Sequence, residues 1–228
     1  MASAILFLEH HDQANIWEDV DFAIGLEPDY LQFMQLGPMP GTALHDAYQR
    51  NGKLLPDIPY EQQHGQDRIW FRHPEFSGDE SREFLKQAFL RDYRRNGASL
   101  LRAIDTTLRG YRYALGHPDE RVRRRAASFV LVRQLRMFLP AARILASNRV
   151  TADLAVRLEA EYRALFGRRS VSELAGTAAI GALAAAEWAR VRFVSDVRHP
   201  KGNVIRYRWQ HSKDAVSGYM APAWETEG

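Results

Sequence analysis

Two short segments, each following an apolar run, carry the residues that could do chemistry or bind a ligand. The first is Glu9-His10-His11-Asp12, directly after an apolar run at residues 4–8. Carboxylates and imidazoles commonly serve as general acids and bases, and histidine titrates near neutral pH. Glu9, His10 and His11 are therefore the candidate catalytic residues. A solvated loop in which one histidine bonds to the backbone is the alternative for this segment.

The second segment, Pro38-Met39-Pro40-Gly41-Thr42, follows the apolar run at residues 30–34. Its two prolines fix φ and remove two backbone donors, so a strand cannot continue through them. Gly41 permits a turn that side-chained residues resist, and Thr42 can cap a helix over residues 42–50. The end of a strand facing the start of a helix is where α/β proteins place ligands. A plain strand-to-helix turn would show the same pattern.

The elements that position these segments form a strand–helix–strand unit. Residues 4–8 are continuously apolar, as in a buried parallel strand, and residues 30–34 have the length and composition of a strand. Between them the sequence predicts a helix over residues 16–25, with Asn15 as its cap and Glu18 in the capping-box position. Such connections give parallel strands, whose carboxyl ends carry function in barrel enzymes. Adjacent histidines on an extended strand point to opposite faces, so we predict no metal site there.

The strand at residues 30–34, the Pro-x-Pro-Gly-Thr turn and the helix ending at Asn51-Gly52 resemble the last strand–helix unit of radical S-adenosylmethionine (radical SAM) enzymes. Within that superfamily they are most similar to the cobalamin-binding branch, and the resemblance covers residues 3–73. It implies that Pro38, Pro40, Gly41 and Thr42 line the S-adenosylmethionine (SAM) site beside the adenine. It also implies that Glu9 and His10 face the cavity.

The chain contains no cysteine. Iron–sulfur clusters are held by cysteine thiolates, and the Cys-x-x-x-Cys-x-x-Cys signature of radical SAM enzymes is missing. The resemblance therefore implies the C-terminal section of such an enzyme, which is not catalytically competent alone. SAM, a [4Fe-4S] cluster and cobalamin would belong to the complete enzyme. Its partner would be the missing N-terminal barrel half, encoded with this chain or by a split gene.

Composition sets the outer bounds on location and partners. Hydrophobic residues make up 46% of the 228 residues and charged residues 26%, which are ordinary globular values. The absence of cysteine agrees with a cytoplasmic protein, the N-terminus does not have the pattern of a signal peptide, and the apolar stretch at residues 174–186 is too short to span a bilayer. Only four of the 31 basic residues are lysines, but net charge is +3 and no nucleic-acid motif is present, so we predict no nucleic-acid binding.

The remaining chain is predicted to be mainly helical. The fold class is thus an α/β fragment, the last strand–helix units of a partial TIM-type barrel, followed by a mainly α domain. The expected divisions are a barrel segment at residues 1–55, an irregular aromatic-rich connector at 56–76, a helical domain at 77–198, and a strand and tail at 199–228. Within the helical domain, Ser77 and Ser170 begin capping boxes, and Pro140 should kink or divide the helix that contains it.

A second function stays open for the helical domain. Residues 129–145 mix arginines with large apolar side chains, as in a bundle helix with a basic rim or a helix lying on a membrane surface. The helix after Ser170 has a small-residue surface that would let another backbone approach closely. The alternative is therefore a protein- or membrane-surface interaction module without catalysis, with peripheral membrane contact.

Overall fold

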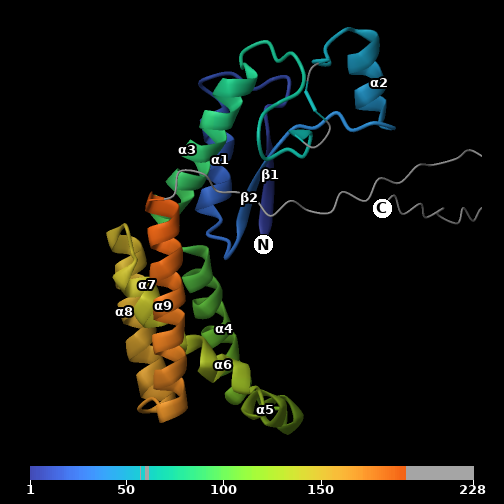
Figure 1. The fold of residues 1–228 in the computed structure, drawn as a ribbon. Helices are drawn as coiled ribbons and strands as arrows, with labels where there is room; N and C mark the ends of the chain where they lie inside the picture. Colours follow the sequence, from blue (N-terminus) through green and yellow to red (C-terminus); the bar gives the residue numbers. More distant parts are fainter. Residues whose placement is uncertain (57, 60–61, 194–228) are drawn as a thin grey trace, which may run out of the picture. The chain divides into compact units, whose positions relative to one another are not determined.

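The computed structural model describes residues 1–56, 58–59 and 62–193, and it is mainly helical (Figure 1). It divides into two units, Met1–Ala185 and Ala186–Gly228. Of the second unit, only the end of one helix, residues 186–193, is described. The strand predicted near residues 204–209, the tail and the predicted boundary after residue 198 all lie outside the described residues.

The first unit begins with the expected strand–helix–strand arrangement. Strands β1 (Ala2–Leu6) and β2 (Leu31–Gln35) pair in parallel, with Ala2 opposite Leu31 and Leu6 opposite Gln35. Helix α1 (Ile16–Gly25) lies between them in the chain, with the bounds that its apolar periodicity predicts. The described strands form this two-stranded sheet and one isolated bridge between Leu54 and Phe71.

Strand β1 ends two residues earlier than the apolar run predicts, because the backbone turns at Phe7. Phe7 has a φ of +63°, a left-handed value that bulky side chains rarely adopt. Its ring is fully buried and packs edge-on against Phe76 and Phe84, with centroids 5.1 and 5.5 Å away. Aromatic packing from the connector and from a later helix thus stabilises a turn that no local signal shows.

The predicted cap of α1 is wrong. Asn15 has helical backbone angles and its side chain makes no capping hydrogen bond. Instead, Asp12 Oδ1 accepts from the amides of Ala14 and Asn15, both at 2.8 Å. Asp12 thus caps the chain three residues before the predicted cap. The Asn15 side chain points back to the loop, where it donates to the His10 carbonyl at 2.9 Å.

Helices cover one face of the sheet, and among the described residues the other face is covered only near Met34, by Gly65 and Gln66 of the connector. Helices α1 and α3 (Gly78–Asn96) contact the strands and lie on one side of them (Figure 1). Leu6 and Phe33 point to this side and are fully buried in its core. On the opposite face, Ser3, Ile5 and Gln32 are exposed.

Helix α2 (Ala43–Arg50) follows β2, and the connector then leads to a helical region. The helices after α3 are α4 (Ser99–Leu115), α5 (Glu120–Ala127), α6 (Val130–Gln134), η2 (Leu135–Met137), α7 (Leu139–Ile144), α8 (Arg149–Phe166) and α9 (Val171–Phe193). The Ser77 capping box is confirmed, and Pro140 lies in the first turn of α7, where a missing amide is tolerated. A second core forms among α4, α7 and α8, around Leu101, Leu139 and Leu158.

Gly97, at the end of α3, offers a test of the fold. Its φ of +75° and ψ of −171° belong to a region that essentially only glycine occupies. A Cβ there would also lie 3.3 Å from Thr151 Oγ1. We expect Gly97→Ala to lower the free energy of unfolding by about 1–3 kcal/mol. Urea denaturation would measure this loss.

Gly110 is the matched control for Gly97. It lies in the interior of α4, with no atom within 4 Å of the place that a Cβ would occupy. Because alanine is the better helix former, Gly110→Ala should raise the free energy of unfolding by roughly 0.5–1 kcal/mol. If both substitutions changed the free energy of unfolding in the same direction, the backbone conformation assigned to Gly97 would be contradicted.

Candidate functional site

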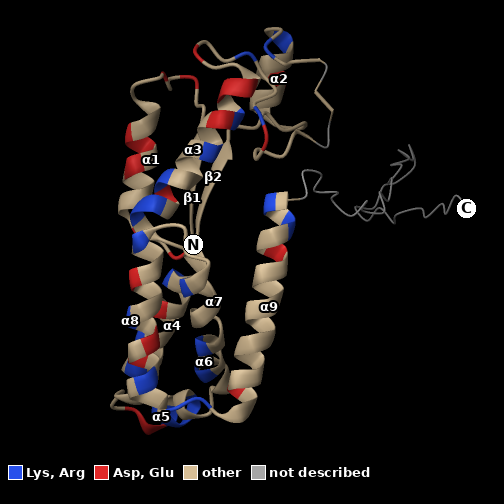
Figure 2. Cartoon of the chain, turned by 60° about the vertical axis from the view of Figure 1, so that its left-hand side comes forward, with Lys and Arg blue, Asp and Glu red and all other residues tan. Residues whose placement is uncertain are grey.

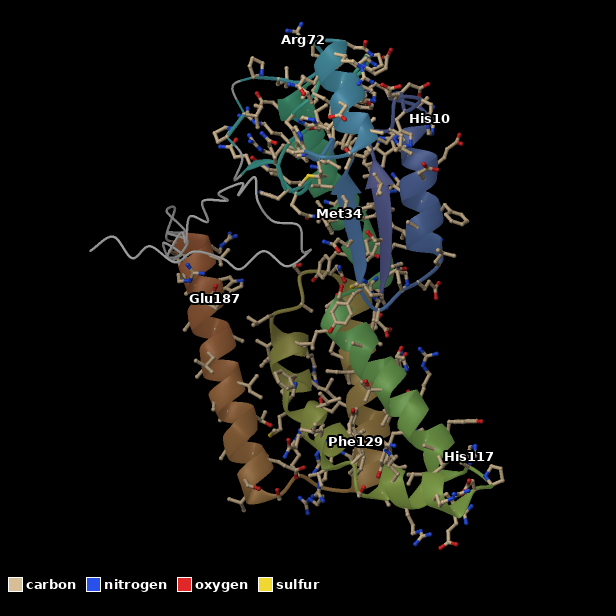
Figure 3. The ribbon with its side chains drawn as sticks, turned by 90° about the vertical axis from the view of Figure 1, so that its right-hand side faces the viewer. His10, Met34, Arg72, His117, Phe129 and Glu187 are labelled. Atoms are coloured by element: carbon tan, nitrogen blue, oxygen red, sulfur yellow. The ribbon has the colours of Figure 1, made fainter. Side chains whose placement is uncertain are left out.

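The carboxyl ends of β1 and β2 meet at one edge of the sheet. The Leu36 amide, just past β2, donates to the Leu6 carbonyl at 2.8 Å. Beyond this edge lie both predicted segments: residues 9–12 belong to the loop between β1 and α1, and residues 38–42 to the turn between β2 and α2. Figure 3 labels His10 in this loop and Met34 near the end of β2. The topology thus brings the two segments to the same end of the unit.

Glu9 is tied to the far end of α2. Lys53 Nζ donates to Glu9 Oε1 at 2.7 Å, and this lysine also lies 5.2 Å from the centroid of the Tyr48 ring. The hydrogen bond from Lys53 lowers the pKa of the half-exposed Glu9 carboxyl below its ordinary value. Glu9 is therefore a carboxylate at neutral pH, suited to accept hydrogen bonds, and its lowered pKa makes it a weak base.

Tyr48 lies beneath this pair and is buried. Burial raises its pKa above the ordinary value of a phenol, and the nearby Glu9 charge adds to the increase. The hydroxyl nevertheless has no hydrogen-bond partner of adequate geometry among the described residues, so we assign the coupling with Glu9 to charge. The hydroxyl stays protonated and available as a donor.

His11 holds the loop in place. It is 2% exposed, its Nδ1 accepts from the Leu8 amide at 3.0 Å, and its Nε2 lies 2.9 Å from Asp19 Oδ2. Because Nδ1 accepts, the ring proton sits on Nε2 and is donated to Asp19. Both nitrogens are thus occupied, in agreement with the alternative of a loop histidine that bonds to the backbone.

His10 is exposed beside it, with the two ring centroids 4.7 Å apart. Ligand atoms of His10, His11 and Asp19 all lie within 4.8 Å of one another, a set that could suit zinc. However, the proton on His11 Nε2 leaves no lone pair there for a metal. We therefore assign no metal to this cluster, and His10 is the histidine of the pair that is open to solvent.

The predicted SAM turn is largely exposed. Pro38 is buried, whereas Pro40, Gly41 and Thr42 are exposed. Gly41 has a φ of +85°, with no atom within 4 Å of the place of a Cβ. Thr42 caps α2 as predicted: its Oγ1 accepts from the His45 amide at 3.2 Å and donates to the Met39 carbonyl at 2.7 Å. The turn therefore presents an open backbone surface beside a helix start.

The two predicted groups are not in direct contact. Glu9 pairs with Lys53 beyond the C-terminal end of α2, whereas Thr42 caps its N-terminal end. The eight residues of α2 span about 12 Å. No hydrogen bond joins residues 9–12 to residues 38–42 in the part of the chain that the structure describes.

No protein-family model, curated protein or solved structure matches this chain. Its function has to be argued from its own residues.

Sequence reasoning missed four contributors to the site. Lys53, just beyond α2, donates to Glu9, and Tyr48 in α2 lies against the Lys53 ammonium. His73 Nε2 donates to the Leu8 carbonyl at 2.9 Å. A fourth, Gly37, lets Trp70 approach: a Cβ there would lie 2.7 Å from the indole ring. The available signals were one of only four lysines in an arginine-rich chain and the aromatic-rich connector. Neither signal specifies a contact across more than thirty residues.

Proposed function

We propose that residues 1–55 are the last two strand–helix units of a partial TIM-type barrel, and that the chain is the C-terminal section of a radical SAM-like enzyme of the cobalamin type. The observation that carries this proposal is the uneven covering of the parallel β1–β2 sheet. Helices cover one face, while Ser3, Ile5 and Gln32 lie exposed on the other. In a β/α barrel the helices lie outside and the opposite strand face points inward, so additional strands would cover this face.

In this proposal the turn at residues 38–42 is one wall of the SAM site. It lies at the carboxyl ends of the strands, where β/α barrels place their sites. The open backbone at Gly41 leaves room for a flat ring such as adenine to approach it. Glu9 and His10 would face the same cavity, with Lys53 fixing the charge and position of Glu9.

The complete enzyme would use SAM, a [4Fe-4S] cluster and cobalamin. Because this chain has no cysteine, the cluster ligands would come from the missing N-terminal barrel half or from a split-gene partner. The residues of this chain would contribute to SAM binding and orientation, and the helical region would serve for substrate binding or docking. Catalysis by this chain alone is not part of the proposal.

A titration of the ¹⁵N-labelled chain with SAM, followed by NMR, tests this proposal. A chain that supplies only one wall of the SAM site should bind SAM weakly. Changes in the chemical shifts of backbone amides detect such weak binding and show which residues are affected. We expect shifts centred on Gly41, Thr42 and His45. Gly41→Trp should weaken the affinity at least about tenfold, since the indole would occupy the space assigned to adenine. Gly167→Trp, which adds the same ring at another glycine of positive φ with no atom within 4 Å of the place of a Cβ, should leave the affinity unchanged.

Shifts confined to other regions, or equal affinities of the wild-type and Gly41→Trp chains, would count against a SAM wall at this turn. Circular dichroism of both tryptophan variants shows whether each retains the fold. The comparison is interpretable because both substitutions add the same side chain to a backbone of positive φ with no neighbouring atom in the way.

The second candidate is a helical interaction module, and helix α9 favours it. Figure 2 shows charged residues only toward the two ends of this 23-residue helix. Within the first unit, its apolar side chains Val171, Leu174 and Leu183 are 84%, 54% and 72% exposed. None of the described helices combines the length and apolar content needed to cross a bilayer. An exposed apolar helix of this kind is suited to a protein or membrane surface.

A further inference from the structure

A cavity of about 510 Å³ lies where α8 ends and α9 begins. Four arginines and a single carboxylate line it, so the cavity is strongly basic. The residues that matter are Arg136, Glu159, Tyr162, Arg163, Arg168 and Arg169. All of them belong to the first unit of the chain.

The two inner arginines are already paired within the protein. Arg136 is 2% exposed, binds the Glu173 carboxylate and donates to the Gly167 carbonyl at 3.0 Å. Arg169 donates to Glu159 Oε1 at 3.0 Å and to the Arg136 carbonyl at 3.2 Å. These bonds fix the inner wall of the cavity and use its one carboxylate.

The two outer arginines leave positive charge uncompensated. Arg163 and Arg168 are exposed, and neither forms an ion pair with a carboxylate of the described residues. Their guanidinium groups present planar donor forks, a geometry that matches phosphate and carboxylate oxygens. The cavity therefore has an inner wall held in place by Arg136 and Arg169. At its outer side are Arg163 and Arg168, which no carboxylate of the described residues neutralises.

Two buried donors in the same lining also have no partner among the described residues. The Tyr162 hydroxyl belongs to a residue that is 1% exposed, and the Arg169 Nε–H is likewise shielded from solvent. Burial raises the pKa of Tyr162 to about 12, so its hydroxyl stays protonated. A buried donor without an acceptor is destabilising, and a ligand rich in acceptor oxygens would remove this destabilisation.

We propose that this cavity binds a phosphate group. A phosphate supplies several acceptor oxygens and up to two negative charges, which balance the two uncompensated arginines better than the single charge of a carboxylate would. The cavity is large enough for more than the phosphate, and Leu174 adds an apolar surface for the rest of the ligand. The ligand class is thus a phosphate ester. This proposal is independent of the SAM site on the β1–β2 unit.

Isothermal titration calorimetry with inorganic phosphate, at an ionic strength held constant with sodium chloride, tests the site. We expect saturable binding to the full chain. The double variant Arg163→Gln/Arg168→Gln should weaken it by about a hundredfold, since two charge-assisted bonds are lost. The double variant Arg121→Gln/Arg125→Gln, on exposed positions of α5, removes the same charge and should bind as the wild type does.

Tyr162→Phe separates a ligand contact from a structural role. The hydroxyl has no partner among the described residues of the free chain, so its removal should leave thermal stability the same or higher. Phosphate affinity should fall by about tenfold. An unchanged affinity, no saturable binding by the wild type, or equal losses in the two double arginine variants would each overturn the proposal. Acetate that displaces phosphate equally well would overturn it too, since the site would then take any anion.

A vesicle-binding experiment distinguishes a lipid headgroup from a soluble phosphate ester as the ligand. Phosphatidylcholine vesicles with and without phosphatidic acid are added to the wild-type chain and to the Arg163→Gln/Arg168→Gln variant. Binding that requires phosphatidic acid and both arginines identifies a lipid headgroup. Binding of inorganic phosphate without vesicle binding identifies a soluble phosphate ester. Both outcomes support a phosphate site.

Discussion

Replacing Asp92 by alanine is expected to lower the free energy of unfolding by about 3–5 kcal/mol. Asp92 in α3 and Arg102 in α4 form a two-pronged ion pair, with both oxygen–nitrogen distances at 2.8 Å. Both side chains are 8% exposed. Removal of the carboxylate leaves a buried guanidinium without its counter-charge, and this uncompensated charge accounts for the size of the loss.

An exposed pair of the same geometry is the control for Asp92. Asp21 and Arg91 also form a two-pronged pair, with both distances at 2.6 Å, but their side chains are 38% and 49% exposed. Because water and salt screen exposed pairs, Asp21→Ala should lower the free energy of unfolding by only about 0–1 kcal/mol. Urea denaturation of both variants measures the difference. If both variants lost the same free energy of unfolding, burial would not determine how much these ion pairs stabilise the fold.

Glu173→Ala should have a comparable effect, because Glu173 joins three segments. Its carboxylate binds the buried Arg136 and also Arg133, whose Nε lies 2.9 Å from Oε1. It also accepts from the Ser170 amide at 2.7 Å and so caps α9. The loss leaves Arg136 buried and unpaired, and we expect about 3–5 kcal/mol at neutral pH.

This loss should depend on pH. Hydrogen bonds from Arg136, and to a smaller extent from Arg133, hold the pKa of Glu173 well below its ordinary value of 4.5. A carboxyl group whose pKa is lower in the folded state than in the unfolded state stabilises the fold. This stabilisation is complete above the pKa of the unfolded state and is lost as pH falls from there toward the pKa of the folded state. The stability difference between wild type and Glu173→Ala should therefore be constant from about pH 7 down to about pH 5 and shrink below 4.5.

Glu187→Ala serves as the control in that experiment. Glu187 pairs with Arg190 three residues along the same helix, and both side chains are exposed. Its removal should change stability little, at any pH. A Glu173→Ala loss that stays unchanged down to about pH 3 would contradict the role assigned to the ionised carboxylate.

Local signals predicted much of the fold. The caps at Thr42 and Ser77 depend on residues three positions apart, so the sequence alone indicates where α2 and α3 begin. The end of β1 could not be predicted in this way. The left-handed turn at Phe7 is stabilised by Phe76 and Phe84, about seventy residues further along the chain.

The candidate site was predictable in its residues more than in their arrangement. The segment at residues 9–12 stands at the carboxyl end of β1, as expected. The partners of Glu9 and His11 are Lys53 and Asp19, which sequence spacing does not connect to them. The tautomer of His11 follows from its bond to the Leu8 amide and could not be inferred from the residue type.

The most direct test of the central claim is to read the DNA immediately upstream of the Met1 codon and in the neighbouring genes. The partial-barrel proposal predicts coding sequence for additional barrel strands with a Cys-x-x-x-Cys-x-x-Cys motif, in frame or in an adjacent gene. Such a sequence would assign this chain to a complete radical SAM-like enzyme or to a split one. Its absence from both places would contradict the proposal and leave the helical interaction module as the function to pursue.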